Sequence, residues 1–228
     1  MQPTARISLF EDKFVLGILV LTVLIAVFGG IFLSKSPSGP TVLNKEESKE
    51  ALSVKPDDWI KGVPEAPITI VEYLDFECEA CQAYYPITKK LQEEYQSKVR
   101  FVVRYFPLPG HKNSITSATA AEAAGIQGKF WEMHDLLYEN QKTWGEKTAP
   151  DPSLFTEYAK QIGLDMEKFS TDINSQQVLS RINRDKIAGG SLGISGTPTF
   201  FINGEKIPNP KGYDDFKSII DGLLPSTQ

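Results

Sequence analysis

Two cysteines, Cys78 and Cys81, lie where a run typical of a strand gives way to a run typical of a helix, and the chain has no others. Residues 66–76, APITIVEYLDF, are rich in β-branched and aromatic side chains, which predicts a buried strand. Cys78 to about Tyr95 predicts a helix, which Pro86 should kink. Two cysteines this close cannot form a disulfide framework, and alone they cannot supply the four ligands of a structural zinc site. The pair therefore indicates a site at a strand–helix junction.

The order of the predicted elements restricts the fold further. Residues 99–106 predict a second strand, so strand, helix and strand form a unit with two parallel strands. A long helical stretch follows, with Asp165 and Ser175 as predicted N-caps. A further strand, a hairpin turn and a final helix are predicted at residues 197–202, 203–204 and 213–223. This split order predicts an α/β protein with a thioredoxin-like fold over residues 57–228, which carries an inserted helical domain at about 111–190.

The N-terminal part of the chain has a different character. Residues 14–33 carry no charged side chain, and at about 1.5 Å per residue a helix of this length spans about 30 Å, the thickness of the hydrocarbon layer. The stretch is longer than the apolar part of a usual signal peptide, and Ser34-Lys35-Ser36 is a poor cleavage site, which favours an uncleaved anchor over a cleaved leader. We expect a cytoplasmic tail at 1–13, one transmembrane helix at 14–33, and a mobile linker at 34–56 in which a short helix is allowed from Glu46 to Leu52.

The charge pattern excludes other classes of function. The 24 Lys and Arg against 29 Asp and Glu leave a net charge of −5, and no basic run occurs, so we expect no nucleic-acid partner. The sequence has no glycine-rich phosphate loop and no dinucleotide fingerprint. We expect neither a metal nor a cofactor, because the two sulfur atoms can act as the redox-active group themselves.

The position of the cysteines predicts their roles. A Cys-x-x-Cys pair at the start of a helix indicates a redox motif, because unpaired N–H groups and the helix dipole favour a thiolate there. Cys78 is predicted to be the more exposed, attacking thiolate. Cys81 lies one turn further into the helix and is predicted to resolve a mixed disulfide.

Three further residues are candidates for the same site. Pro198, after Thr197, opens a predicted strand; it is either an ordinary strand-start proline or a cis-proline that leaves the Thr197 backbone open to pair with a substrate chain. Glu72 lies between apolar neighbours in the strand before the cysteines. It is either a partly buried acid with a raised pKa, suited to proton transfer with Cys81, or a solvated charge on an edge strand.

Much of the folded part resembles the DsbA-like branch of the thioredoxin superfamily, in its membrane-anchored bacterial form. The resemblance lies in four segments: APITIVEYLDFECEAC (66–81), RYFPLPGH (104–111), AAEAAGIQGKFWEMHDLLYEN (120–140) and LGISGTPTFFINGEKI (192–207). It implies a nucleophilic Cys78, a resolving Cys81, a cis Pro198 and an acidic residue, Glu72, beneath the buried cysteine. It also implies that the oxidised protein passes its disulfide to substrate thiols.

The expected function is an extracytoplasmic thiol–disulfide oxidoreductase, held in the cell membrane by a single span, that introduces or exchanges disulfides in exported proteins. Its expected partners are reduced exported polypeptides, the lipid bilayer through residues 14–33, and a membrane quinone-linked thiol oxidase that restores the disulfide. A reductase or isomerase would use the same residues. Two other classes stay open: a tethered peptide-binding chaperone with a structural disulfide, and metal binding by Cys78 and Cys81 with a partner subunit.

The dipeptide between the cysteines departs from that of the strongest oxidants in this branch. It is Glu79-Ala80, where those oxidants carry a histidine. Glu79, with Asp75 and Glu77 nearby, is expected to oppose the Cys78 thiolate. We therefore expect a higher Cys78 pKa, and a less oxidising disulfide, than in a relative with histidine at this place.

Overall fold

The computed structural model describes residues 43–145, 147 and 152–224. The strands are β1 (Trp59–Lys61), β2 (Ile68–Leu74), β3 (Val99–Tyr105), β4 (Thr199–Ile202) and β5 (Glu205–Lys206). The helices are α2 (Lys45–Leu52), α3 (Glu79–Glu94), α4 (Ser114–Ile126), α5 (Phe130–Glu139), α6 (Gln141–Trp144), α7 (Pro152–Gln161), α8 (Met166–Asp172), α9 (Gln176–Ser191) and α10 (Tyr213–Leu223). These elements confirm the predicted strand–helix–strand unit, the helical insertion and the strand–hairpin–helix end.

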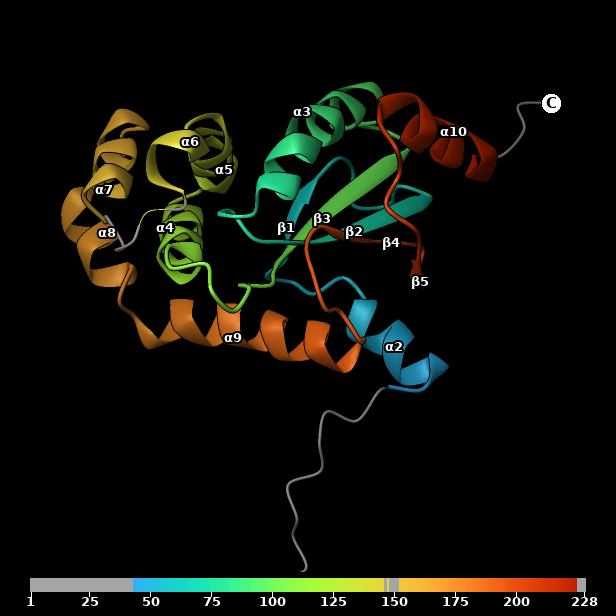
Figure 1. Ribbon diagram of the computed structural model, residues 1–228, viewed down its shortest axis with the longest axis horizontal. Coiled ribbons are helices and arrows are strands. Elements are labelled where there is room, and N and C mark those ends of the chain that lie inside the picture. The colour runs from blue at the N-terminus through green and yellow to red at the C-terminus, as the bar shows by residue number, and fades with distance from the viewer. Residues whose placement is uncertain (1–42, 146, 148–151, 225–228) are drawn as a thin grey trace, which may run out of the picture. The chain divides into compact units, whose positions relative to one another are not determined.

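One mixed sheet forms the centre of the domain, with the strand order β1-β3-β2-β4-β5. Strands β2 and β3 are parallel, and the other pairs are antiparallel. Both central strands are buried on both faces, which explains their nearly continuous apolar sequence. Figure 1 shows α3 and α10 on one face of the sheet, α2 and α9 toward the other, and α4 to α8 to one side. The predicted thioredoxin-like fold with an inserted helical domain is confirmed.

Successive side chains of β2 lie on opposite faces of the sheet and pack into two different cores. Ile68 and Ile70 pack with residues of α3 and α10 on one face. Val71 and Tyr73 pack on the other face, in a cluster that includes Leu52 of α2. Glu72 therefore shares the α3 side of the sheet with Ile70, which places it on the same side as the helix that begins after Cys78.

The prediction of a mobile linker at residues 34–56 is wrong for the second half of that range. Residues 45–52 form α2, which the sequence allowed as a short helix, but this helix is docked on the domain rather than part of a mobile tether. Asn44 caps it with a capping box to Glu47, and its last residue, Leu52, is buried. The folded domain thus begins before residue 57, because a mainly polar segment can dock through a single apolar side chain and its backbone carbonyls.

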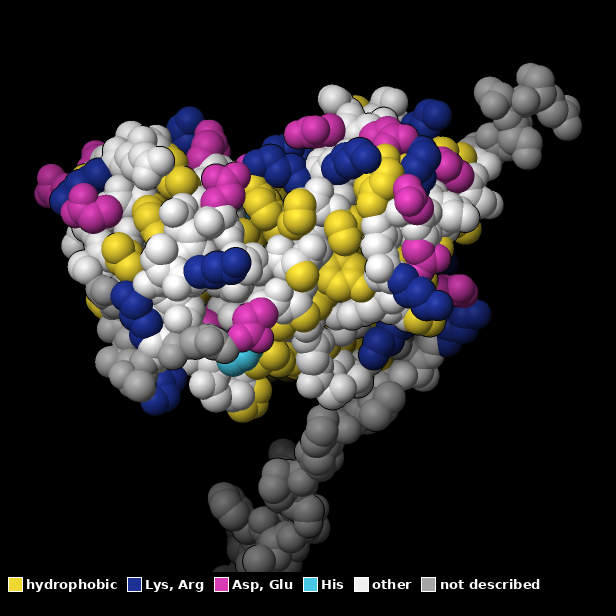
Figure 2. Space-filling view, turned by 45° about the horizontal axis from the view of Figure 1, so that its top comes forward, with side chains coloured by type: hydrophobic (Ala, Val, Ile, Leu, Met, Phe, Trp, Pro, Cys, Tyr) yellow, Lys and Arg dark blue, Asp and Glu magenta, His cyan; other side chains and the backbone are white. Residues whose placement is uncertain are grey.

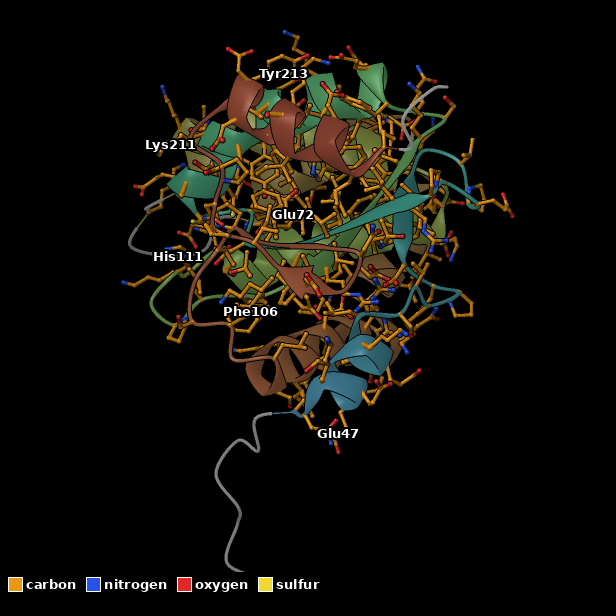
Figure 3. The ribbon with its side chains drawn as sticks, turned by 90° about the vertical axis from the view of Figure 1, so that its right-hand side faces the viewer. Glu47, Glu72, Phe106, His111, Lys211 and Tyr213 are labelled. Carbon is orange, nitrogen blue, oxygen red and sulfur yellow. The ribbon has the colours of Figure 1, made fainter. Side chains whose placement is uncertain are left out.

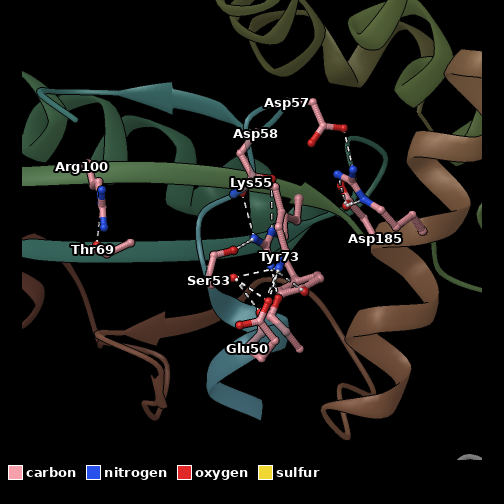
Figure 4. A network of polar contacts seen from close by, with 12 residues as sticks. Glu50, Ser53, Lys55, Asp57, Asp58, Thr69, Tyr73, Arg100 and Asp185 are labelled. Atoms are coloured by element: carbon pink, nitrogen blue, oxygen red, sulfur yellow. Dashed lines mark hydrogen bonds and ion pairs between the residues drawn. The ribbon is translucent and has the colours of Figure 1, made fainter. Parts of the chain in front are cut away.

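A buried ion network fastens α2 and α9 to the sheet. The Arg104 guanidinium on β3 donates to Asp58 Oδ2 at 2.8 Å and to the Ser53 carbonyl at 2.7 Å. Arg181 on α9 reaches the other oxygen of Asp58 at 3.2 Å and Asp185 at 3.1 Å. Figure 4 shows Ser53, Asp58, Tyr73 and Asp185 in this network. The charges are paired and hydrogen-bonded, as buried ions must be.

The transmembrane prediction lies outside the described residues, as do residues 1–13 and most of the linker. Within the described part of the chain, no helix combines the length and the apolar character needed to cross a bilayer.

Candidate active site

The two cysteines occupy the first turn of α3, as predicted. Strand β2 ends at Leu74, a short turn follows, and Cys78 is the N-cap residue of α3, with extended backbone angles (φ −71°, ψ 121°). Both residues are free thiols. Cys78 is 8% exposed and Cys81 is 1% exposed, so the first cysteine is the one that solvent reaches.

The environment of Cys78 favours its thiolate. A hydrogen bond from the Cys81 thiol makes the largest contribution and lowers the pKa of Cys78 to about 5. Burial acts in the opposite direction, whereas Thr197 and the backbone N–H groups of Cys81 and Ala80 lower the pKa further. The last two are the unpaired donors at the start of a helix.

The pKa of Cys81 shifts in the opposite direction to that of Cys78. Burial raises the pKa of Cys81 well above its usual range, and the hydrogen bond to Cys78 and the charges of Cys78 and Glu72 raise it further. The two thiols therefore differ in chemistry: at neutral pH one is a thiolate and the other keeps its proton. That difference is the one a nucleophile and a resolving thiol require.

The segment before β4 closes the other side of Cys78. The Thr197–Pro198 peptide bond is cis, as the resemblance implied. The Cys78 sulfur lies 3.3 Å from the Thr197 carbonyl oxygen, to which it donates a hydrogen bond only in its protonated form. Asn209 donates to the Pro198 carbonyl at 2.9 Å, which holds this segment in place. The hydroxyl of Thr197 is buried and has no partner of good hydrogen-bond geometry among the described residues.

Glu72 lies in the middle of the sheet, where it pairs in register with Val103 on β3 and Phe200 on β4. It is therefore not on an edge strand. Its side chain is 9% exposed, and burial raises its pKa to about 8. No described residue donates a hydrogen bond to it, and its charge acts on Cys81. Figure 3 shows Glu72 in the interior of the domain.

Glu79 is exposed in the first turn of α3. The main contributions to the Cys78 pKa come from Cys81, burial, Thr197 and backbone N–H groups, and Glu79 is not among them. The expected opposition between Glu79 and the thiolate is thus outweighed, because direct hydrogen bonds act at shorter range than a solvated carboxylate. Whether a histidine at this place would lower the pKa further stays a prediction.

The structure adds two residues of the insertion, Gln141 and Asn113, that hold the cysteine turn. Gln141 of α6 is buried and donates to the carbonyls of Phe76 and Cys78, at 2.7 and 2.9 Å. Glu77 is buried and accepts a 2.6 Å hydrogen bond from the backbone N–H of Asn113, just before α4. Sequence reasoning missed both, because each contact joins positions more than 30 residues apart.

Tyr138 of α5 brings a further polar group to the buried side of the site. Its ring packs on Phe76 and Tyr85, and its hydroxyl is buried without a hydrogen-bond partner among the described residues. Burial raises the pKa of Tyr138, and the charges of Cys81 and Glu72 raise it further. The sequence showed this residue only as one of several aromatic side chains at helical spacing.

His111 and Asp75 complete the site. The His111 ring contacts the buried carboxylate of Asp75 at 2.7 Å, and the charge of Cys78 contributes to the raised pKa of His111. His111 lies between β3 and α4, and nothing in the sequence joins it to the end of β2. No group of three or more potential metal ligands occurs among the described residues.

Comparison with known proteins agrees with this geometry. A family model described as thioredoxin matches residues 54–222. The structure is similar to α-DsbA1 of Wolbachia pipientis, at 27% identity and a TM-score of 0.70 over 77% of this chain and 95% of that one. It is also similar to oxidised BdbD of Bacillus subtilis, at 26% identity and a TM-score of 0.65 over 72% of this chain and 91% of that one.

Sequence relatives give a second comparison. A Na⁺/H⁺ antiporter named NhaA 3 from Salinispora tropica is 41% identical over 177 residues, which is 77% of this chain and 26% of the relative. NhaA 1 from Mycolicibacterium vanbaalenii is 34% identical over 93% of this chain and 34% of the relative. The chain thus spans between a quarter and a third of these curated relatives. From the match over residues 54–222 and the similarity to both solved structures, the chain belongs to the thioredoxin family, in its DsbA-like branch.

Proposed function

We propose that this protein is an extracytoplasmic disulfide oxidoreductase that introduces or exchanges disulfides in exported polypeptides through Cys78 and Cys81. The observation that carries the proposal is the opposite response of the two thiols. The pKa of Cys78 is lowered to about 5, so at pH 7 roughly a hundred Cys78 thiolates are present for each thiol, whereas Cys81 stays protonated. A stable Cys78 thiolate is a good leaving group, which favours passing the disulfide to a substrate.

The proposed cycle starts from the Cys78–Cys81 disulfide. A substrate thiolate attacks Cys78 Sγ, the bond between the cysteines breaks, and Cys81 takes up a proton. Glu72 supports this step, since its pKa of about 8 leaves it protonated at neutral pH, so it can supply the proton that Cys81 takes up. A second substrate thiolate then attacks the substrate sulfur of the mixed disulfide and releases Cys78 as a thiolate. The substrate dithiol loses two electrons and two protons. The protein gains both electrons and one proton, which ends on Cys81, and the other proton goes to solvent because Cys78 leaves as a thiolate.

Substrate contact is proposed at the segment beside Cys78. The Thr197 carbonyl lies 3.3 Å from the Cys78 sulfur, so an extended chain bound there would bring its own cysteine to that sulfur. Figure 2 shows hydrophobic side chains along the middle of the face in view, between the helical insertion on the left and the part with α3 and α10 on the right. Apolar segments of an unfolded polypeptide fit a surface of this kind.

The proposal includes an anchor at residues 14–33, with residues 1–13 in the cytoplasm and the active site on the other side of the membrane. The apolar run supports it, and so does the presence of the matching domain within relatives named as antiporters. A membrane quinone-linked thiol oxidase is the proposed source of oxidising equivalents. Labelling of Cys78 in intact cells by a membrane-impermeant thiol reagent tests the location, and labelling only after lysis contradicts it.

Refolding of a reduced protein with several disulfides tests the activity. The oxidised full-length chain should restore activity to the substrate, Cys78→Ser should abolish this, and Cys81→Ser should accumulate a mixed disulfide with the substrate. Oxidase activity that survives Cys78→Ser would remove Cys78 as the nucleophile. Recovery of a scrambled substrate would identify an isomerase.

One alternative is a tethered chaperone whose Cys78–Cys81 disulfide is structural. A catalytic pair should equilibrate with glutathione, whereas a structural pair should resist reduction. If the disulfide resists glutathione and the double Cys→Ser variant still suppresses aggregation of an unfolded protein, the chaperone is the correct assignment.

A further inference from the structure

The buried carboxylate of Asp75, directly after β2, has three hydrogen-bond donors around it. Its Oδ1 accepts the backbone N–H of Glu77 at 2.9 Å. Its Oδ2 accepts the backbone N–H of Leu108 at 2.9 Å and lies 2.7 Å from Nδ1 of His111. The Asp75 side chain is fully buried, so these three donors replace the water it has lost.

This arrangement ties the His111 ring to Asp75, the residue that also bonds the start of the cysteine turn. The Asp75 carbonyl also accepts the backbone N–H of Cys78 at 3.1 Å, so one residue bonds both the start of α3 and the loop that carries His111. Asp75 can only accept at this contact, which places a proton on Nδ1. The ring is about one-third exposed, whereas the carboxylate that holds it is inaccessible. Figure 3 shows His111 near the surface and Glu72 in the interior.

The charges around His111 favour its protonated form. Partial burial alone would lower the pKa of His111, but the hydrogen bond that His111 donates to Asp75 and the charges of Asp75, Glu77 and Cys78 together raise it. These groups come from the end of β2 and from the turn into α3. The interaction between two charges is reciprocal, so the contribution of the Cys78 thiolate to the His111 pKa implies an equal contribution of the imidazolium to the thiolate, one smaller than those of Cys81, Thr197 and the backbone N–H groups.

We propose that the imidazolium of His111, held by Asp75, is a positioning residue that stabilises the Cys78 thiolate from outside the Cys-x-x-Cys motif. It supplies a positive charge that Glu79-Ala80 cannot. This inference rests on the proposed disulfide exchange, and it adds a charge from outside the motif to the hydrogen bonds that already stabilise the Cys78 thiolate. As the pH rises through the His111 pKa, the positive charge and its support for the thiolate are lost.

The test uses the full-length reduced chain and reads the Cys78 pKa from thiolate absorbance near 240 nm. His111→Gln should raise this pKa by about half a unit to one unit, which is roughly a three- to tenfold change in the ionisation constant. His111→Lys should keep the pKa low, because it restores the positive charge. Lys160→Gln is the control, since it removes one positive charge from an exposed pair with Glu157 on α7.

A second measurement does not depend on any variant. Nuclear magnetic resonance should give a higher His111 pKa in the reduced protein than in the oxidised protein, because only the reduced form carries the thiolate. A purely structural His111 would titrate identically in both forms, and that result, or an unchanged Cys78 pKa in His111→Gln, overturns the inference. Failure of substrate oxidation with this coupling intact would instead overturn the proposed function alone.

Discussion

Glu72 shows how far one residue's chemistry depends on its surroundings. It is a carboxylic acid on the central strand β2, with apolar neighbours along the chain and no donor among the described residues. Burial without a partner raises its pKa from 4.5 to about 8. Asp75, only three residues later and also buried, has three donors around its carboxylate. The two buried acids thus differ in their hydrogen-bond donors, since three surround Asp75 and no described residue donates to Glu72.

The raised pKa of Glu72 predicts how stability depends on pH. Between about pH 4.5 and pH 8 the folded state holds a proton on Glu72 that the unfolded state has released, so the contribution of Glu72 to the free energy of unfolding falls as the pH rises, by up to about 1.4 kcal/mol per pH unit. Glu72→Gln should remove this loss. Urea unfolding of the reduced protein at pH 5 and pH 8 measures it, with the exposed Glu65→Gln as control. An equal loss in Glu72→Gln and the parent chain would contradict the prediction.

At the scale of single elements, α9 shows how packing overrides a local signal. Glycine disfavours the interior of a helix, yet α9 continues through Gly189 and Gly190 to Ser191. Gly189 lies against the sheet, where a Cβ atom would approach Phe106 at 2.7 Å and Tyr73 at 3.1 Å. A Cβ atom on Gly190 would meet nothing within 4 Å. The first glycine therefore allows close approach of helix and sheet, and the second has no such role.

These neighbouring glycines make a matched pair of substitutions. Gly190→Ala should raise the free energy of unfolding by about 0.5–1 kcal/mol, because alanine favours the helix. Gly189→Ala should lower it by about 1–3 kcal/mol, because overpacking against two aromatic rings outweighs the same helix preference. Chemical denaturation of both variants measures the difference. Equal effects of the two substitutions would show that α9 does not pack closely at Gly189.

At the scale of the whole molecule, the docked helix α2 belongs to the domain. Leu52 is buried against Val71, Tyr73 and other residues on one face of the sheet. The Ala51 and Ser53 carbonyls accept hydrogen bonds from the buried Arg104 guanidinium, at 2.5 and 2.7 Å. Removal of this segment would expose apolar surface and leave two donors of a buried cation without partners.

Truncation tests this domain boundary. A chain that starts at residue 57 should be less stable than one that starts at residue 43 by several kcal/mol, because burial of one leucine contributes about 1.5–3 kcal/mol and each lost buried hydrogen bond costs about 1–3 kcal/mol. Urea midpoints measure the difference. Lys49→Ala in the longer chain is the control, since Lys49 is exposed on α2. Equal midpoints would place the boundary near residue 57, as the sequence indicated.

Local signals in the sequence were enough to predict most elements. The run of β-branched residues predicted β2, Asp165 and Ser175 do cap α8 and α9, and Asn203-Gly204 does join β4 to β5. Each of these depends on residues within a few positions of one another, and local conformational preference decides them. Strand β1 was missed because its three residues carry too short a pattern.

The cysteine pair at a helix start was likewise readable from the sequence, because the spacing of Cys78 and Cys81 and the strand before them are local features. The residues that surround the pair could not be predicted from the sequence. Gln141, His111 and Tyr138 reach the site from the helical insertion or from the loop before it, and only tertiary packing brings them within range of the cysteines. Solvent exclusion and hydrogen bonds across long sequence separations set the pKa of each group, so the chemistry of the site was decided by the fold.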